Sequence, residues 1–387
     1  MKLTIEDVRS RFVKHLGGEQ PGSVYASPGR VNLIGEHTDY NNGFVFPGAV
    51  EQGVIAEVRP NGTRNVRAYS IDMKDYVEFS IDDEKGPNAT HFRFIYGVAR
   101  EMMALGVPVE GFDTAFAGDV PLGAGMSSSA ALESTFAFAL NDLFGENKIE
   151  KMELAKVGQA VEHKYIGTNC GIMDQFISLF GKKGQLVRLD CQSGDFQYFP
   201  WRPKGYKLVL VNSCVKHELQ GSPYNDRRKS CEYVADAIKN FKPEIQTLRD
   251  CTLEDLEKVK DEVGDVNYRR ARYVLGEIDR VLAVCQALNE DDYETVGEKM
   301  YETHEGLSKE YEVSCEEIDF LVGVASDCGV TGSRLMGGGF GGCTINLVTT
   351  DLYPTFVEQV NKQYKEKFGR TCKIIDVVIG DGARKLC

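Results

Sequence analysis

The chain has 387 residues, of which 42% are hydrophobic and 27% charged, a composition typical of a globular protein. This length exceeds what one hydrophobic core usually serves, so we expect two domains. The net charge of −13 argues against a nucleic-acid or anionic-membrane partner. No apolar stretch has signal-peptide or bilayer-spanning length, and the 11 cysteines are scattered without zinc-site spacing. We therefore expect a cytoplasmic protein with free thiols.

The predicted elements mix strands and helices without a regular alternation. In the first half, we expect strands at 24–26, 53–58 and 112–116, a hairpin-like alternation over 66–80, and helices at 92–105, 130–143, 151–165 and 172–180. In the second half, we expect strands at 207–211, 344–348 and 377–379, with several helices between 226 and 328. This pattern predicts an α+β fold rather than a doubly wound parallel sheet. The domain boundary is expected near Pro200 to Pro203.

The first informative segment, Gly29 to Asn42, reads GRVNLIGEHTDYNN. It carries a guanidinium, two carboxylates, an imidazole and two hydroxyls, on Arg30, Glu36, Asp39, His37, Thr38 and Tyr40. So many directional hydrogen-bonding groups suit a polyhydroxylated ligand, and the cation suits a neighbouring phosphoryl group. The alternative is a solvated polar turn after a strand.

The second segment, Pro121 to Ala130, reads PLGAGMSSSA and lies between a predicted strand and a predicted helix. Free N–H groups at a helix start bind phosphates, and Gly123 and Gly125 allow the backbone to approach a ligand closely. The segment lacks the lysine of a GxxxxGK[ST] loop, so backbone amides, Mg²⁺ or an arginine would have to replace that ammonium group. The alternative is a tight strand–helix turn with serine caps.

The third segment, Met336 to Gly342, reads MGGGFGG and formally matches GxGxxG. A dinucleotide fold needs a helix after these glycines, but Cys343 to Val348 has the pattern of a strand, so we reject that interpretation. Two alternatives stay open. The segment either packs between the domains against the second segment or is a plain glycine-rich turn.

The three segments together resemble the motifs of the GHMP small-molecule kinases, and the first resembles the galactokinase signature. The resemblance implies a two-domain GHMP-kinase-like α+β fold with the active site in the cleft between the domains. It implies an N-terminal domain of residues 1–200, which the C-terminal strand at 375–387 joins, and a C-terminal domain of residues 201–374. The implied reaction is ATP-dependent phosphorylation of the anomeric hydroxyl of galactose, giving α-D-galactose 1-phosphate and ADP. This is the first phosphorylation step of galactose catabolism in the Leloir pathway.

The resemblance also assigns residues. Asp174, in the matching segment Gly171 to Gln175, would accept or orient the proton of the attacking hydroxyl, although any aspartate is favoured in the first turn of a helix. Arg30 would supply positive charge to the transition state. The implied sugar contacts are Glu36, His37, Thr38, Asp39, Gly171 and Tyr224. The implied ATP contacts are Gly123, Ala124, Gly125, Met126, Ser127, Ser128 and Ser129, and the implied Mg²⁺ ligands are Ser129 and Glu162.

From the residues alone, Glu162 would pass as a surface charge on a helix, and Tyr224 is equally compatible with a packed aromatic side chain. The sequence departs from the family where adenine is expected to pack, because His91 and Phe94 replace the tryptophan and tyrosine that galactokinases often carry there. We expect a monomer that binds small molecules only.

Two alternative functions remain. A related kinase could act on N-acetylgalactosamine, arabinose or a non-sugar alcohol, although the intact EHTDY run argues against the non-sugars. A non-catalytic sugar and nucleotide sensor is the second alternative. The complete serine run at Ser127 to Ser129 and the presence of Asp174 favour an enzyme.

Overall fold

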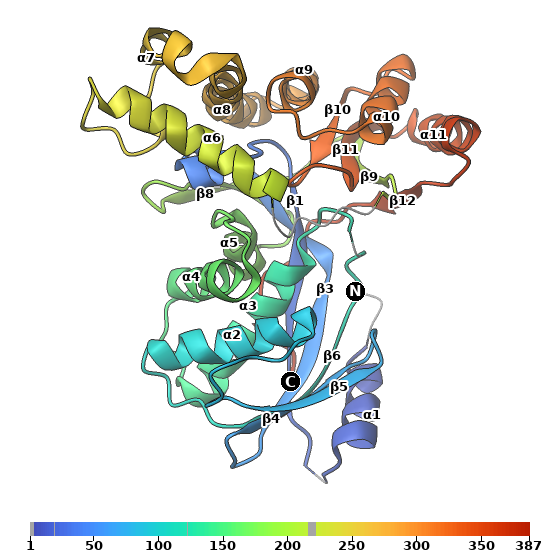
Figure 1. Ribbon diagram of the computed structural model, residues 1–387. Coiled ribbons are helices and arrows are strands. Elements are labelled where there is room, and N and C mark those ends of the chain that lie inside the picture. Colours follow the sequence, from blue (N-terminus) through green and yellow to red (C-terminus); the bar gives the residue numbers. More distant parts are fainter. Residues whose placement is uncertain (1–3, 19, 122, 216–221) are drawn as a thin grey trace.

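The structure is a computed structural model that describes residues 4–18, 20–121, 123–215 and 222–387. Leu122 of the second segment and Gly221 near Tyr224 lie outside these ranges. The molecule has two halves, each built around its own sheet (Figure 1). The mixture of helices and mostly antiparallel strands confirms the predicted α+β class.

The lower half in Figure 1 contains a six-stranded sheet in the order β13-β1-β3-β6-β4-β5. Its strands are β1 (Ser23–Asn32), β3 (Pro47–Pro60), β4 (Asn65–Ser70), β5 (Asp75–Ser80), β6 (Phe112–Gly118) and β13 (Arg384–Lys385). All pairs are antiparallel except β4 with β6. The predicted alternation over 66–80 is therefore a hairpin of two strands, β4 and β5.

Helices cover both faces of this sheet (Figure 1). One face packs against α2 (Thr90–Ala104), α3 (Ser128–Phe144), α4 (Lys151–Val161) and α5 (Met173–Phe180), and the other against α1 (Ile5–Leu16). The chain continues from α4 into a π-helical turn, Glu162–Ile166. Helix α3 is buried along most of its length, which is why its sequence is apolar all round rather than on one stripe.

The upper half contains a four-stranded antiparallel sheet in the order β10-β11-β9-β12. Its strands are β9 (Tyr206–Asn212), β10 (Gly332–Met336), β11 (Cys343–Thr349) and β12 (Lys373–Asp376). Along β9, Leu208 and Leu210 join one hydrophobic core, while Val209 and Val211 join another on the opposite face. Both faces are buried, so this strand is apolar throughout, as the sequence predicted.

The helices of the upper half are α6 (Ser222–Lys239), α7 (Leu253–Lys258), α8 (Lys260–Asn289), α9 (Tyr293–Glu305), α10 (Glu316–Asp327) and α11 (Tyr353–Phe368). A three-stranded sheet of β2 (Phe44–Val45), β7 (Gln185–Asp190) and β8 (Phe196–Pro200) completes the fold. Its residues share one core with the upper half, where Phe44 and Phe199 pack with residues of α8. None of the helices in the described ranges is long and apolar enough to cross a membrane.

The predicted strand at 377–379 is wrong. Strand β12 ends at Asp376, and the chain then returns to the lower half, where Ile379 bridges Val50 and β13 pairs with β1. The apolar character of this segment reflects burial during the crossing, because Ile379 packs into the shared core. That core holds residues from both sides of residue 200, so the exact domain limits stay a prediction.

Candidate active site between the two halves

A cavity with about 950 Å³ of empty space, including its opening to solvent, lies where the three sequence segments meet. Fifteen of the predicted site residues line it: Arg30, Glu36, His37, Asp39, Gly123, Ala124, Gly125, Met126, Ser127, Ser128, Ser129, Glu162, Gly171, Asp174 and Tyr224. Thr38 does not.

Arg30 and Asp174 form a bidentate ion pair at the centre of the cavity. The guanidinium donates from Nε to Asp174 Oδ1 at 2.7 Å and from Nη2 to Oδ2 at 2.9 Å. Arg30 is 4% exposed, whereas the Asp174 side chain is 29% exposed. The pair therefore presents the carboxylate, rather than the guanidinium, to a ligand in the cavity. Arg30 also donates through Nη1 to the carbonyl of Gly125, so it joins the phosphate-loop segment to the aspartate.

The backbone of β1 approaches the second segment closely. The N–H of Arg30 donates to Met126 O at 3.0 Å, and a Cβ at position 29 would lie 2.6 Å from the same oxygen. Only glycine at this position permits that contact. Gly29 therefore explains how the first two segments come together.

Helix α3 begins at Ser128 and points its first turn into the cavity. Ser127 adopts the left-handed conformation, with φ 56°, and makes no side-chain cap. Its hydroxyl instead donates to Asp174 Oδ2. No side chain of the described residues caps the first-turn N–H groups of α3, and Ser128 and Ser129 line the cavity. A helix start in this condition favours a bound anion such as a phosphate.

The third segment packs tightly against the second, so it is more than a plain turn. A Cβ on Gly125 would lie 2.9 Å from Met336 O, and one on Gly337 would lie 3.2 Å from Gly125 O. Gly337 and Gly338 line the cavity. Strand β11 follows directly, which confirms the rejection of a dinucleotide fold.

Glu162 lies beside Ser129, where α3 begins at the cavity, and is 7% exposed, so its interpretation as a surface charge is wrong. Burial raises its pKa to about 6, and Asp174 contributes to the rise, while the hydroxyls of Ser129 and Thr168 oppose it. Burial and the neighbouring Glu162 also raise the pKa of Glu133 well above its usual value. None of the causes acting on either glutamate is a cationic side chain of the described residues.

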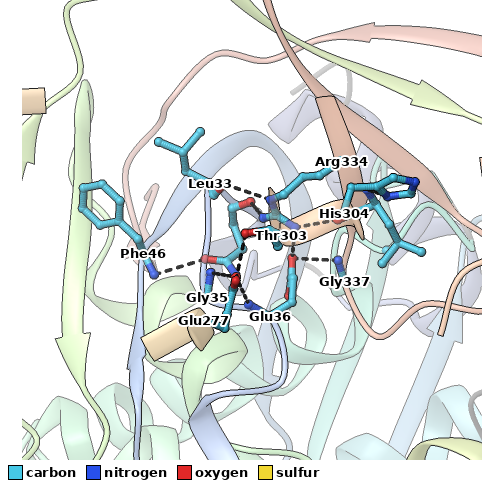
Figure 2. A network of polar contacts seen from close by, with 12 residues as sticks. Leu33, Gly35, Glu36, Phe46, Glu277, Thr303, His304, Arg334 and Gly337 are labelled. Carbon is cyan, nitrogen blue, oxygen red and sulfur yellow. Dashed lines mark hydrogen bonds and ion pairs between the residues drawn. The ribbon is translucent and has the colours of Figure 1, made fainter. Parts of the chain in front are cut away.

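Elsewhere in the cavity wall, the Glu36 carboxylate is held by the upper half of the molecule (Figure 2). Its Oε1 accepts from Arg334 Nη1 at 3.0 Å and from the Gly337 N–H at 2.9 Å. Glu36 is 2% exposed and Arg334 is fully buried. The pair is thus a buried ion pair in the wall of the cavity.

His37 adjoins Glu36 and lies within a group of aromatic rings. Its Nδ1 hydrogen-bonds with Tyr40 Oη at 2.7 Å, and its ring centroid lies 5.4 Å from that of Tyr224. Burial and the nearby Arg227 lower the pKa of His37 to about 3, so the imidazole is neutral at pH 7. Tyr224 lines the cavity, and its packing on His37 is compatible with either predicted role.

Asp39 packs directly against Gly171 in the wall of the cavity. Its Oδ1 accepts from the Tyr40 N–H at 3.0 Å. Burial raises the pKa of Asp39 to about 6, and the charge of Asp174 adds to this rise. A Cβ at position 171 would lie 2.1 Å from Asp39 Oδ2, so a glycine is required there for the carboxylate to keep its place.

Comparisons with known proteins agree with this geometry. Residues 10–60 match the galactokinase galactose-binding signature, residues 93–182 match the N-terminal domain of GHMP kinases, and residues 285–366 match their C-terminal domain. The galactokinase of Clostridium acetobutylicum is 40% identical over 370 residues, covering 94% of this chain and 95% of that protein. The galactokinase of Roseiflexus sp. is 38% identical over 385 residues, covering 99% and 98%.

The chain belongs to the galactokinase family. Among solved structures, Lactococcus lactis galactokinase complexed with galactose superposes with a TM-score of 0.92 at 31% identity, covering 98% of each chain. Methanococcus jannaschii mevalonate kinase, at 18% identity and a TM-score of 0.65, shares the fold. The predicted GHMP-kinase fold is confirmed.

Within this galactokinase signature, Thr38 is the predicted sugar contact whose side chain does not reach the cavity. It is fully buried, and its hydroxyl lies 3.0 Å from Gly35 O and 2.6 Å from Phe44 O. The hydroxyl therefore holds the turn together. His91 and Phe94, at the positions expected to contact adenine, do not line the cavity either, and His91 Nε2 lies 3.4 Å from Asp75 Oδ2.

Sequence reasoning missed several residues of the site. Thr168 and Met173 line the cavity. Arg334 and Glu133 do not line it, but Arg334 donates to Glu36 and Glu133 lies close enough to Glu162 for their charges to interact. A signal existed for the last two, since a charged residue within an otherwise apolar strand or helix is seldom buried without a partner. The identity of each partner was not readable from the sequence.

Proposed function

We propose that this protein transfers the terminal phosphoryl group of ATP to the anomeric hydroxyl of galactose, giving α-D-galactose 1-phosphate and ADP. The observation that carries the proposal is the meeting of Arg30, Asp174 and the start of α3 in one cavity. A carboxylate for the hydroxyl proton and amides for the phosphates thus lie side by side. Phosphoryl transfer requires mainly such alignment and charge.

In this reaction, Asp174 receives or orients the proton of the attacking hydroxyl, and Arg30 keeps that carboxylate in place with two hydrogen bonds. The positive charge of Arg30 also lies near the first turn of α3, where negative charge develops on the transferred phosphoryl group. The backbone from Gly123 to Ser129 holds the triphosphate. Its N–H groups take the place of the absent P-loop lysine.

Ser129 and Glu162 would hold Mg²⁺. Mg²⁺ prefers few protein ligands, all of them oxygen, and this pair supplies a hydroxyl and a carboxylate. The raised pKa of Glu162 supports the assignment, because a carboxylate buried near Asp174 and Glu133 lacks a compensating positive charge. When bound, the ion would neutralise charge on the phosphate oxygens.

Glu36, His37, Asp39, Gly171 and Tyr224 form the sugar end. Glu36 and Asp39 are oriented acceptors, and sites that hydrogen-bond a substrate hydroxyl reject analogues lacking it by roughly 10⁴. Glucose presents its 4-hydroxyl on the opposite side of the ring, so it would leave such an acceptor unpaired. The comparisons give no support to a different sugar or to a sensor role.

The proposal also includes a cytoplasmic, monomeric enzyme that opens galactose catabolism. All 11 cysteines are free thiols, which suits a reducing compartment.

A coupled ADP-release assay tests the proposal. The purified protein is offered galactose, glucose, N-acetylgalactosamine and arabinose, each with ATP and Mg²⁺ and each with a no-sugar control. We expect release with galactose and at least 10³-fold less with glucose. Equal rates on the two epimers, or release only with N-acetylgalactosamine, would overturn the proposal. ADP release that is the same without any sugar would do so as well.

A further inference from the structure

A buried polar network from the upper half supports the turn that carries Glu36 and His37 (Figure 2). It comes from α8, α9 and β10 and includes two charged side chains, Glu277 and Arg334, both fully buried. Neither lines the cavity. Both contact the backbone or side chain of a residue that does.

Arg334 fixes which oxygen of Glu36 can serve a ligand. Its guanidinium donates to Leu33 O at 2.9 Å, to Asn32 O, and to Glu36 Oε1 at 3.0 Å. The Gly337 N–H donates to the same Oε1. Glu36 Oε2 has no hydrogen-bond partner among the described residues, and Glu36 lines the cavity. One oxygen is thus committed to the protein, and the other is left to accept from a sugar hydroxyl.

Glu277 fixes the backbone of the same turn. Its Oε1 accepts from the N–H of Gly35 at 2.8 Å and from the N–H of Glu36 at 3.3 Å. Gly35 has φ +97°, a conformation that L side chains rarely adopt. The other oxygen of Glu277 accepts from Arg280 Nε at 2.7 Å and from Thr303 Oγ1 at 2.8 Å. A carboxylate held at both oxygens therefore holds an unusual turn.

We propose that Arg334 and Glu277 are positioning residues that set the affinity and hydroxyl selectivity of the sugar end, by fixing Glu36 from behind. The inference rests on the proposed phosphorylation of galactose and names residues that determine its sugar recognition. Arg334 contacts Glu36 across 298 residues of sequence, and Glu277 contacts Gly35 across 242. Sugar binding in the lower half thus depends on side chains of the upper half.

A purely structural role would not need these charges. A buried ion pair stabilises a fold no better, in general, than well-packed apolar residues of the same volume. What the charges add here is geometry: a planar guanidinium directs one carboxylate oxygen away from the cavity and leaves the other facing it. The expected consequence of losing that geometry is weaker galactose binding with unchanged nucleotide binding.

The test uses three variants and a matched control. Arg334→Lys keeps the charge but loses the planar fork, and Glu277→Gln keeps an oxygen for the two N–H groups. Thr303→Val removes a single hydrogen bond to Glu277 and is the mildest change, which keeps the test available if either charged-site variant fails to fold. The control is Ser333→Ala, adjacent to Arg334 on β10, where the hydroxyl bonds Asn346 Oδ1 at 2.7 Å and does not contact Glu36.

The readouts are KM for galactose and for ATP, kcat, and galactose binding by calorimetry in the absence of ATP. We expect Arg334→Lys to raise the galactose KM and Kd by roughly tenfold or more, with the ATP KM within about twofold. Thr303→Val should change them in the same direction and less. For the wild-type protein, the deoxygalactose that lacks the hydroxyl bound by Glu36 should have a much higher Kd than galactose. For Arg334→Lys, the ratio of these two Kd values should be smaller.

The inference is overturned if folded variants keep the wild-type galactose KM, if the galactose and ATP KM rise together, or if Ser333→Ala raises the galactose KM equally. Calorimetry separates this inference from the proposed function. Wild-type protein that binds galactose without phosphorylating it would overturn the function alone.

Discussion

The cavity has a proposed sugar end, which includes Glu36 and Asp39, and a proposed phosphate end at the start of α3, which includes Glu162. Both ends contain buried carboxylates, but the groups that neighbour these carboxylates differ. At the sugar end, Glu36 is paired with Arg334 and the Gly337 N–H, while Asp39 accepts from the Tyr40 N–H and keeps a raised pKa. At the phosphate end, Glu162 and Glu133 lie near each other and near Asp174, with raised pKa values and without a cationic partner among the described residues. The Arg30–Asp174 pair lies between the two ends.

The difference matches the charge of what each end is proposed to bind. A neutral sugar needs acceptors whose orientation is already fixed, and Glu36 meets that need before the sugar arrives. A nucleotide with Mg²⁺ brings its own positive ion, so its site holds carboxylates whose charge the protein leaves uncompensated. Changes at the two ends should therefore have different kinetic signatures.

The largest effect is expected at the junction of the two ends. Asp174→Asn keeps the shape of the side chain but removes the proton acceptor, so we expect kcat to fall by about 10²–10³ or more, with a smaller change in the galactose KM. Asp190→Asn is the matched control, because Asp190 also pairs with an arginine, Arg249 at 3.3 Å, and does not line the cavity. Steady-state kinetics and thermal unfolding of both variants check this. Near-normal kcat in Asp174→Asn would contradict the assignment.

At the phosphate end, Glu162→Gln should lower kcat/KM by roughly 10–100-fold at low Mg²⁺, since one proposed ligand of the ion is weakened. Raising the Mg²⁺ concentration should recover part of the loss. Glu153→Gln on the same helix is the control, because Glu153 is 46% exposed and pairs with Lys156 outside the cavity. Titration of activity against Mg²⁺ measures both. A Glu162→Gln curve that overlays the wild-type curve would remove Glu162 from the proposed metal site.

At the sugar end, Gly171→Ala should raise the galactose KM by about tenfold, because the new Cβ would lie 2.1 Å from Asp39 Oδ2 and must displace it. The ATP KM should stay near its wild-type value. Gly323→Ala in α10 is the control, since nothing lies within 4 Å of a Cβ there and alanine favours a helix. If Gly171→Ala binds galactose normally, Asp39 does not contact the sugar in the way proposed.

Much of this comparison could be predicted from the sequence, because each end of the cavity has its own contiguous motif. The signature around Glu36 and the serine run before α3 could both be interpreted from residue types and spacing. The ion pair of Arg30 and Asp174, which joins the two ends, could not be predicted from local patterns because its residues are 144 positions apart. Only the family resemblance linked these two residues. The predicted strands and helices were mostly confirmed because their apolar patterns report burial directly.

The differences between expectation and structure have physical causes. Thr38 was predicted as a sugar contact from the family resemblance, and its hydroxyl lies against two backbone carbonyls inside the turn, so a sugar contact of Thr38 stays a prediction. The segment 377–379 is apolar because it crosses between the halves, and burial alone does not distinguish a crossing from a strand. Arg334 was missed because its proposed role depends on its contact with Glu36. No local sequence pattern predicts a contact between residues that are 298 positions apart.

The comparison also predicts how activity depends on pH. His37, with a pKa of about 3, stays neutral down to pH 5, so it does not contribute to the acid limb. Asp39, with a pKa of about 6, becomes protonated and ceases to be a pure acceptor. We expect kcat/KM for galactose to fall by roughly fourfold between pH 7 and pH 5.5. A flat profile over this range would contradict the sugar role of Asp39.

Stability should respond to pH less than activity, because the pKa shifts of the buried groups in the site have opposite effects on the free energy of unfolding. Asp39 and Glu162 have folded-state pKa values above their ordinary values of 3.8 and 4.5, so the folded protein binds protons more readily and gains stability as the pH falls through 6. His37 has a folded-state pKa below its ordinary 6.5, so the unfolded chain binds that proton and stability is lost below pH 6.5. Each contribution is on the order of 1 kcal/mol between pH 7 and 5.5, and two are gained while one is lost, so the wild type should gain about 1 kcal/mol or less. Glu162→Gln removes one of the two gains, so urea unfolding of the ligand-free variant should show a change about 1 kcal/mol less favourable than that of the wild type over this range.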